Sequence, residues 1–157
     1  MSVTAEALHI FKYWIPAILV AAMVWIFSTA SFGETRTGTY LLPILHWLFP
    51  TASPYLLHRL HIAIRKMAHI LEFGIFSILI FRAWRSGRLG WCLGWAIATL
   101  LIAAAFAVLD EIHQAFVPGR GPSVRDVAID TAGALLAQAA VWWYATRKWP
   151  LGGTTPE

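Results

Sequence analysis

The hydrophobic residues of the chain gather in four long windows that carry little charge. These windows cover residues 14–32, 67–84, 91–109 and 127–146. Each one approaches the roughly 20 apolar residues that an α-helix needs to cross the hydrocarbon core of a bilayer. The pattern therefore predicts an all-α, polytopic membrane bundle with four transmembrane helices.

A shorter apolar stretch, YLLPILHWLF, lies between the first two windows at residues 40–49. It is too short to span a bilayer, and Pro43 and Pro50 argue against a long helix because proline lacks the amide hydrogen. We expect an interfacial or re-entrant segment near residues 40–50. Ser53 and Pro54 then resemble a helix start, an N-cap followed by proline, so the second helix should begin before the hydrocarbon.

Composition supports a membrane protein and excludes several soluble classes. Of the 157 residues, 59% are hydrophobic and 13% are charged, whereas about 25% are charged in an average soluble domain. The net charge of +4 would suggest nucleic acid for a soluble protein. In a membrane protein it reflects topology and headgroup contacts, so we expect lipids and no nucleic acid as partners. The single cysteine, Cys92, excludes an internal disulfide, and the length predicts one membrane domain over residues 1–157.

Positive charges at the ends of the windows predict the orientation. The short loop between the second and third windows is basic and has no acid, and with four spans it shares one side with both termini. The cations on that side are Lys12, Arg82, Arg85, Arg88, Arg147 and Lys148. Because short basic loops stay in the cytoplasm, we expect both termini to be cytoplasmic and residues 33–66 and 110–126 to face outward.

Five of the eight acids lie within or beside a predicted span, where charge is costly. They are Glu72, Asp110, Glu111, Asp126 and Asp130. An acidic residue at a helix centre costs about 2.5–3.5 kcal/mol on insertion scales, so such residues normally face the bundle interior and a partner. In the four-span topology all five fall in the outer half of the membrane.

The spacing of the polar residues places them on defined helix faces. Lys66, His69 and Glu72 recur every three residues and form one stripe along the second helix. Asp110 and Gln114 are four residues apart and share a face if the third helix continues past its window.

The fourth window begins with a similar pair. Asp126 and Asp130 are four residues apart, and Gly133, Ala134 and Ala137 continue near the same face, small enough for close helix contact. Three helices thus offer polar faces at a similar depth. Since lipid cannot solvate these groups, we expect them to converge on one pocket.

Several of these residues also have a purely structural explanation. Ser123 and Asp126 fit a capping box in which Ser123 caps the fourth helix, and Asp126 can in addition pair with Arg120 or Arg125. Arg120 lies in VPGRGP, which is either a simple turn or, with glycines around the arginine, a place of close approach to an anion. Lys66 can merely extend to the headgroups.

Three stretches closely resemble the VanZ family of small membrane proteins. They are WIFSTASFG at 25–33, RKMAHILEFGIF at 65–76 and DEIHQAFVPGRGPSVRDVAIDTAGALL at 110–136, and the resemblance extends from Trp14 to the end of the fourth window. It places ten residues on the family's characteristic polar positions: Lys66, His69, Glu72, Asp110, Glu111, Gln114, Arg120, Ser123, Asp126 and Asp130. Phe73 departs from the family, in which tyrosine is common at this position.

The resemblance implies a multi-pass protein of the bacterial cytoplasmic membrane with a link to the cell envelope. The family's namesake is associated with low-level resistance to teicoplanin, a glycopeptide that acts on outward-facing cell-wall precursors. A lipid-linked precursor or a glycopeptide is therefore an expected partner. The resemblance supplies no reaction, no cofactor and no substrate.

One hypothesis is an enzyme that acts on an envelope lipid or a phosphate-bearing, lipid-linked precursor. The residues expected to bind the substrate are Lys66, Gln114, Arg120, Ser123, Arg125 and Asp126, and the cations among them would hold a phosphate. The residues expected to catalyse are His69, Glu72, Asp110, Glu111 and Asp130. His69 with Glu72 would act as general base or nucleophile, and Asp110 or Glu111 would supply the acid.

Two other hypotheses use the same residues without turnover. The cluster can bind a headgroup, a glycopeptide or a proton in a transporter, because intramembrane acids mark proton relays as readily as catalytic sites. It can also brace a structural protein whose function lies with a partner. The acids and His69 are suitable ligands for a hard divalent ion, but we expect no metal because the cations nearby are numerous enough to neutralise the acids.

Overall fold

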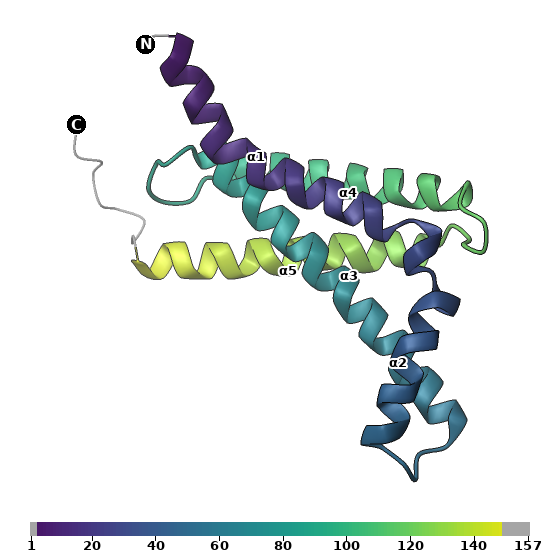
Figure 1. Cartoon of the computed structure of the whole chain (residues 1–157). Helices are drawn as coiled ribbons and strands as arrows, with labels where there is room; N and C mark the ends of the chain where they lie inside the picture. The colour runs from purple at the N-terminus through teal and green to yellow at the C-terminus, as the bar shows by residue number, and fades with distance from the viewer. Residues whose placement is uncertain (1–2, 149–157) are drawn as a thin grey trace.

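The computed structural model describes residues 3–148, which are helical nearly throughout (Figure 1). The elements in chain order are α1 (Val3–Phe27), the short 3-10 helix η1 (Ala30–Phe32), α2 (Glu34–Leu48), α3 (Pro54–Arg85), α4 (Leu93–Ala115) and α5 (Val124–Lys148). No strand occurs among the described residues. The predicted all-α class is confirmed.

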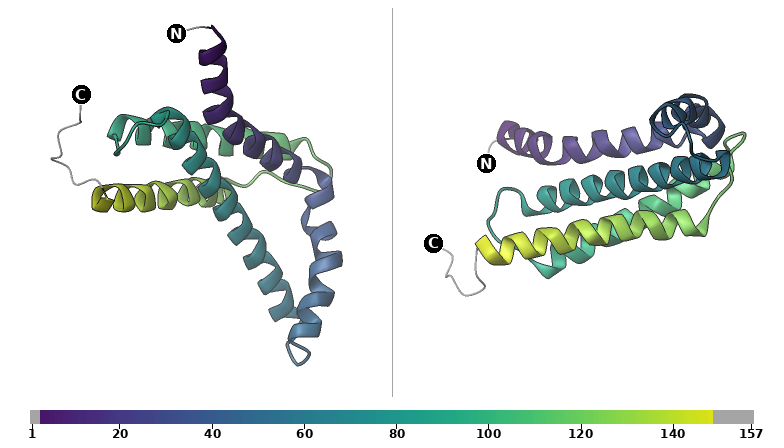
Figure 2. Two further views of the ribbon diagram at one scale, coloured as in Figure 1. Left: turned by 60° about the vertical axis from the view of Figure 1, so that its left-hand side comes forward. Right: turned by 90° about the horizontal axis from the view of Figure 1, so that it is seen from below.

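The long helix α3 is the element around which the others pack (Figure 1, Figure 2). It contacts α1, α2, α4 and α5, and α5 also packs along α4. The start of α1, the α3–α4 connection and the end of α5 lie at one end of the bundle. The end of α1 and the α4–α5 connection lie at the opposite end.

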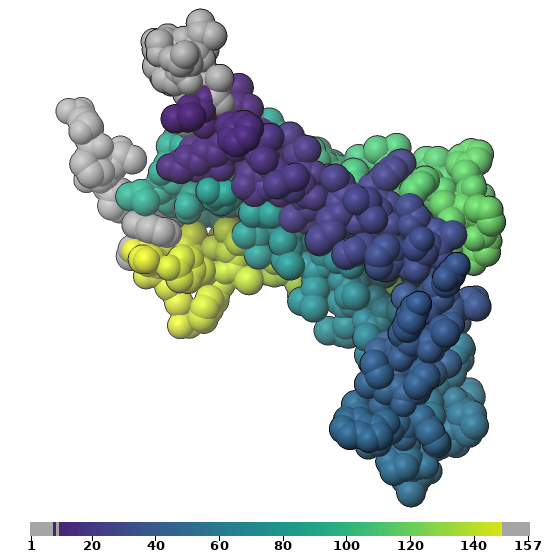
Figure 3. Space-filling view, viewed as in Figure 1, coloured from purple at the N-terminus to yellow at the C-terminus, as the bar shows by residue number. Residues whose placement is uncertain are grey.

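The helix α2 and the first half of α3 form a hairpin that projects from the bundle (Figure 3). Its interior contains Leu57 and His61 of α3 and Leu45 of α2, all buried. The predicted start of α3 is confirmed, because Ser53 Oγ accepts a hydrogen bond from the backbone N–H of Leu56 at 3.3 Å and Pro54 is the first helical residue.

The segment near residues 40–50 is more regular than expected. Pro43 lies inside α2, a helix of 15 residues, so the expectation that it would prevent a long helix was wrong. Proline removes the hydrogen bond to the carbonyl four residues earlier, here that of Thr39. Both Pro43 and Thr39 are exposed, so water or headgroups can satisfy that carbonyl and the helix continues.

Three helices are long and apolar enough to cross a membrane, not the four that were predicted. They are α1 over Ile10–Phe27, α3, and α4; the predicted fourth span, residues 127–146, lies within α5, which is not among them. Asp130 and Gln138 lower the mean hydropathy of α5, and both are buried within the bundle. The count was wrong because the polar residues that join α5 to its neighbours make it less apolar than an independent span. The orientation predicted above assumed four spans, so the number of spans no longer supports it.

α3 and α5 approach each other closely at Gly133. A Cβ atom at this position would lie 2.5 Å from the carbonyl oxygen of Ile70 and 2.9 Å from its Cα, distances that real Cβ atoms do not adopt. Gly74 faces the same contact, where an added Cβ would lie 3.5 Å from the carbonyl oxygen of Gly133. The close helix contact predicted from the small residues after Asp130 is confirmed.

Buried hydrogen bonds continue the same contact toward the centre of the bundle. Ser77 Oγ of α3 donates to the carbonyl oxygen of Ala134 at 3.2 Å, and Gln138 Nε2 of α5 donates to Ser77 Oγ at 2.8 Å. An unsatisfied polar group in an apolar interior costs several kcal/mol. These bonds therefore fix the position of α5 along α3.

Substituting Gly133→Ala should destabilise the protein, because the new methyl group forces the two helix backbones apart. Overpacking of this kind costs about 1–3 kcal/mol. The measurement is thermal unfolding of the purified protein in detergent. Gly94→Ala in α4, where an added Cβ meets only Cys92 Sγ at 3.8 Å, is the matched control and should leave stability unchanged or slightly raised. Equal stability of the two variants would contradict the close contact.

Candidate functional site

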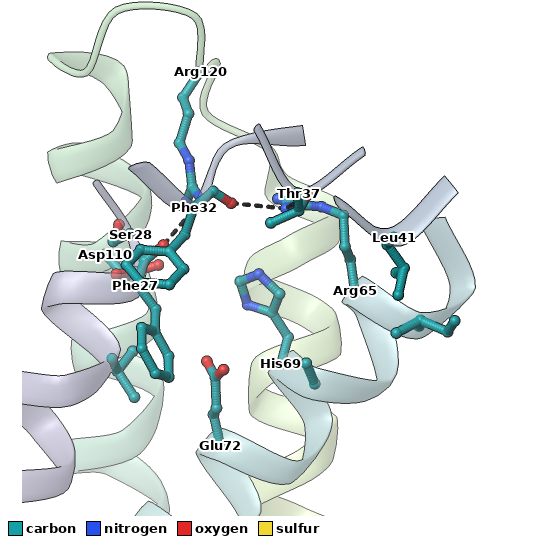
Figure 4. Close-up of a pocket in the computed structure, with 13 residues that line it drawn as sticks. Phe27, Ser28, Phe32, Thr37, Leu41, Arg65, His69, Glu72, Asp110 and Arg120 are labelled. Atoms are coloured by element: carbon teal, nitrogen blue, oxygen red, sulfur yellow. Dashed lines mark hydrogen bonds between the residues drawn. The ribbon is translucent and has the colours of Figure 1, made fainter. Parts of the chain in front are cut away.

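A cavity of about 250 Å³ lies where the end of α1 and the hairpin meet the middle of α3 and the α4–α5 connection (Figure 4). Its apolar wall consists of Val24, Phe27, Phe32, Leu41, Ile64 and Ala68. Its polar side chains are Ser28, Thr37, Arg65, His69, Glu72, Asp110 and Arg120. The cavity thus combines an apolar wall with cations, acids and one histidine.

A buried carboxylate that does not itself line the cavity contacts the cavity's histidine and orients it. His69 Nδ1 on α3 lies 3.1 Å from Asp130 Oδ1 on α5, and Asp130 is fully buried. When Nδ1 carries the proton, it donates to Asp130 and leaves Nε2 as the nitrogen able to accept one. Glu72 also lines the cavity, one turn along α3 from His69 (Figure 4).

The predicted catalytic residues fall into two groups in space. His69, Glu72 and Asp110 line the cavity, whereas Glu111 and Asp130 do not and are buried beside Asp110. One potential ligand atom from each of Asp110, Glu111 and Asp130 lies within 4.8 Å of the others. The structure therefore brings all five residues to one region, but only three of them reach the cavity.

Two predicted substrate-binding residues, Ser123 and Gln114, form hydrogen bonds within the protein away from the cavity. Ser123 Oγ accepts a hydrogen bond from the backbone N–H of Asp126 at 3.3 Å, so the predicted cap by Ser123 is confirmed, but the reciprocal bond of a capping box, to the Asp126 side chain, is replaced by one to Glu111. The backbone N–H of Ser123 donates to Glu111 Oε2 at 2.6 Å. Gln114 is buried, and its Nε2 donates to Asp110 Oδ2 at 2.7 Å. Neither Ser123 nor Gln114 lines the cavity.

The predicted cations are also separated from the cavity, apart from Arg120. Lys66 Nζ lies 3.6 Å from Asp126 Oδ1, in an ion pair whose two side chains are partly exposed. Arg125 is exposed. Lys66, Asp126 and Arg125 do not line the cavity. Of the three cations expected to hold a phosphate, Arg120 is therefore the one that reaches it.

Arg65 lines the cavity in place of Lys66, and sequence reasoning missed it. Its Nη1 donates to the carbonyl oxygen of Phe32 and to Thr37 Oγ1, each at 2.8 Å. The signal was available, because Arg65, His69 and Glu72 are spaced by four and then three residues, which follows a helix face better than a repeat of three. The regular three-residue spacing of Lys66, His69 and Glu72 instead predicted the neighbouring Lys66.

Arg120 reaches the cavity from the α4–α5 connection (Figure 4). Its Nη2 donates to the carbonyl oxygen of Phe27 at 2.9 Å, while its buried Nε has no hydrogen-bond partner among the described residues. Burial lowers the pKa of Arg120, and the nearby charge of Arg65 lowers it further. A guanidinium stays charged in proteins, so Arg65 and Arg120 bring two positive groups to a cavity that Glu72 and Asp110 also line.

Ser28 is a second cavity residue that sequence reasoning did not single out. It is 2% exposed and its Oγ has no hydrogen-bond partner among the described residues. Figure 4 shows it beside Asp110 at the end of α1. A buried hydroxyl without a partner is costly, so it is available to bond to a polar ligand. In the sequence it was visible only as part of WIFSTASFG.

Comparison with known proteins identifies the family of the chain. No curated protein and no solved structure matches it. The family model described as VanZ/LLP1 matches residues 13–145, which include most of α1, all of α3 and α4, the cavity and the buried acids. The chain therefore belongs to the VanZ/LLP1 family.

Proposed function

We propose that this VanZ-family membrane protein is an enzyme that acts on a phosphate-bearing lipid of the bacterial cell envelope. The observation on which the proposal rests is the arrangement of His69, which lines the cavity while the buried Asp130 holds its Nδ1. A histidine oriented by a carboxylate is the usual form of a general base or nucleophile in hydrolases and transferases.

The walls of the cavity indicate the class of substrate. Apolar side chains such as Phe27 and Ile64 suit an acyl or prenyl chain, and Arg65 and Arg120 suit an anionic group. Pockets for whole drug-sized ligands measure about 300–1,000 Å³, so a cavity of about 250 Å³ suits a headgroup with the lipid chain extending outside. A lipid phosphate satisfies both requirements.

The residues at the cavity provide each role that phosphate-ester hydrolysis needs. With Nδ1 bonded to Asp130, His69 Nε2 takes a proton from water, and the water oxygen attacks phosphorus. Arg65 and Arg120 bind the phosphoryl oxygens and hold them in position for this attack. The bond between phosphorus and the leaving oxygen breaks, and Glu72 in its protonated form gives a proton to that oxygen, which belongs to an alcohol in an ester and to a phosphate in a diphosphate. Alternatively, His69 attacks phosphorus itself and water releases the phosphate in a second step.

The distribution of charge suggests which side of the membrane the cavity faces. The end of the bundle that contains the start of α1 and the α3–α4 connection is the basic end identified above, with Arg82, Arg85 and Arg88 in one short acid-free region. The positive-inside rule assigns that end to the cytoplasm. The cavity, at the opposite end of α1, then faces outward in the cytoplasmic membrane. Outward-facing cell-wall lipid precursors are the first class to test, with teicoplanin susceptibility as the cellular readout.

Replacing His69 by Gln should abolish turnover. Purified protein in detergent is incubated with phosphatidic acid, phosphatidylglycerol and undecaprenyl diphosphate, and products are followed by mass spectrometry. Loss of a general base lowers kcat by about 10²–10⁴-fold, and Asp130→Asn should lower it as well because the imidazole loses its fixed orientation. His46→Gln, an exposed histidine of α2, is the matched control. Full activity of His69→Gln would contradict the proposal, and binding of a lipid by the wild type without any product would favour a carrier instead.

Removing the cations should act mainly on KM. A hydrogen bond to a charged group contributes about 1.5–3 kcal/mol, so Arg65→Gln and Arg120→Gln should each raise KM by about tenfold or more. Arg59→Gln, an exposed arginine elsewhere on α3, serves as the control. Both cavity variants with an unchanged KM would exclude a role in phosphate binding.

A further inference from the structure

Three buried carboxylates lie together beside the cavity. Asp110 and Glu111 at the end of α4 are 1% and 5% exposed, and Asp130 on α5 is 0% exposed. One potential ligand atom of each lies within 4.8 Å of the other two. Three negative charges this close cannot all persist in a low-dielectric interior without compensation.

Each of these carboxylates has one oxygen with a protein partner and one without. The partnered oxygens accept from Gln114 Nε2 at 2.7 Å, from the backbone N–H of Ser123 at 2.6 Å, and from His69 Nδ1 at 3.1 Å when that nitrogen carries the proton. The remaining oxygens, Asp110 Oδ1, Glu111 Oε1 and Asp130 Oδ2, are buried and have no hydrogen-bond partner among the described residues. Carboxylates that bind metals are oriented in this way, by an outer hydrogen bond on one oxygen.

The arginine and lysine expected to neutralise these acids form no ion pair with them in the described part of the chain. Lys66 pairs with Asp126 at 3.6 Å, and Arg120 Nη2 donates to the carbonyl oxygen of Phe27. Within the part of the chain that the structure describes, His69 is the one cationic residue in an ion pair with the three acids. Arg120 forms no ion pair with them but lies close enough to Asp110 and Glu111 to interact electrostatically. With His69 neutral, the three acids and Arg120 carry a net charge of −2, which a divalent cation would balance.

We propose that Asp110, Glu111 and Asp130 bind one hard divalent cation, Mg²⁺ or Mn²⁺. All three ligands are carboxylates, and oxygen ligands select Mg²⁺, Ca²⁺ and Mn²⁺ over softer metals. Mg²⁺ typically uses only a few carboxylates and keeps several waters, which fits three ligands at the edge of a cavity. Cys92, the only cysteine of the chain, is exposed at the opposite end of α4 and cannot contribute a thiolate.

This cation site does not depend on the proposed reaction, but it would serve it. Asp110 belongs both to the carboxylate cluster and to the wall of the cavity. A cation bound to Asp110 would lie next to a phosphate in the cavity and polarise its oxygens as a Lewis acid. His69 would then remain a base while Asp130 connects it to the cation.

Direct binding of Mn²⁺ tests the site. Full-length protein in detergent is stripped with EDTA, dialysed and titrated with Mn²⁺, and free Mn²⁺ is followed by electron paramagnetic resonance. We expect one Mn²⁺ per chain, displaced by an excess of Mg²⁺. Asp110→Asn and Asp130→Asn should each weaken binding by about tenfold or more. Asp126→Asn, the partly exposed acid paired with Lys66, is the matched control and should bind as the wild type does.

Thermal unfolding gives a second readout if a variant folds poorly. Mn²⁺ should raise the Tm of the wild type. Asp110→Asn removes one of three like charges, so its Tm in EDTA should equal or exceed that of the wild type, and Mn²⁺ should not raise it further. A wild type that binds no Mn²⁺, or unchanged binding in both Asn variants, would overturn the proposal. The Mn²⁺ titration contains no lipid, so it tests the cation site separately from the proposed reaction. Mn²⁺ binding here, together with no lipid turnover in the activity assay, would refute the proposed function and leave the cation site standing.

Discussion

The close crossing of α3 and α5 at Gly133 and Ile70 is the constraint on which the rest of the structure depends. Ile70 is the neighbour of His69, and Gly133 lies three residues after Asp130, so the contact that admits only glycine also brings the histidine to its carboxylate. On the other side of the crossing, Gln138 Nε2 donates a hydrogen bond to Ser77 Oγ and joins the two helices. The same geometry therefore stabilises the bundle and assembles the site.

The acids of the chain experience three different environments because of this packing. Glu72 faces the cavity, Asp110, Glu111 and Asp130 are buried together, and Asp126 pairs with Lys66 where solvent and headgroups reach. A membrane interior does not solvate charge, so buried acids need a specific partner. The environment of each acid therefore follows from how deeply it is buried and which partners it has, and not from whether it is Asp or Glu.

The sequence was sufficient for features that depend on local chemistry. Runs of apolar residues predicted α1, α3, α4 and α5 but not α2, Ser53 and Ser123 marked helix starts through their capping side chains, and Gly133 marked a close contact. In each case the signal lies within one or two turns of the chain. Such features can be deduced without knowing what the helix packs against.

Features that depend on tertiary contacts were harder to deduce. Pro43 is tolerated in α2 because its face of the helix is exposed, and α5 is less apolar than a span because Asp130 and Gln138 face the bundle. The choice of Arg65 over Lys66 at the cavity depends on which way α3 is rotated about its axis. That rotation is set by the contacts with α1 and α5, and the spacing of Arg65, His69 and Glu72 is its only indication within α3 itself.

The most direct test of the account is the protonation of the His69 imidazole, observed by nitrogen-15 NMR of histidine-labelled protein in detergent or nanodiscs. The proposed role of His69 requires a proton held on Nδ1 by Asp130, with slow exchange, and predicts a return to the tautomer mixture of an exposed histidine such as His46 in Asp130→Ala. A His69 ring that carries its proton on Nε2, or that is indifferent to Asp130→Ala, would contradict the account.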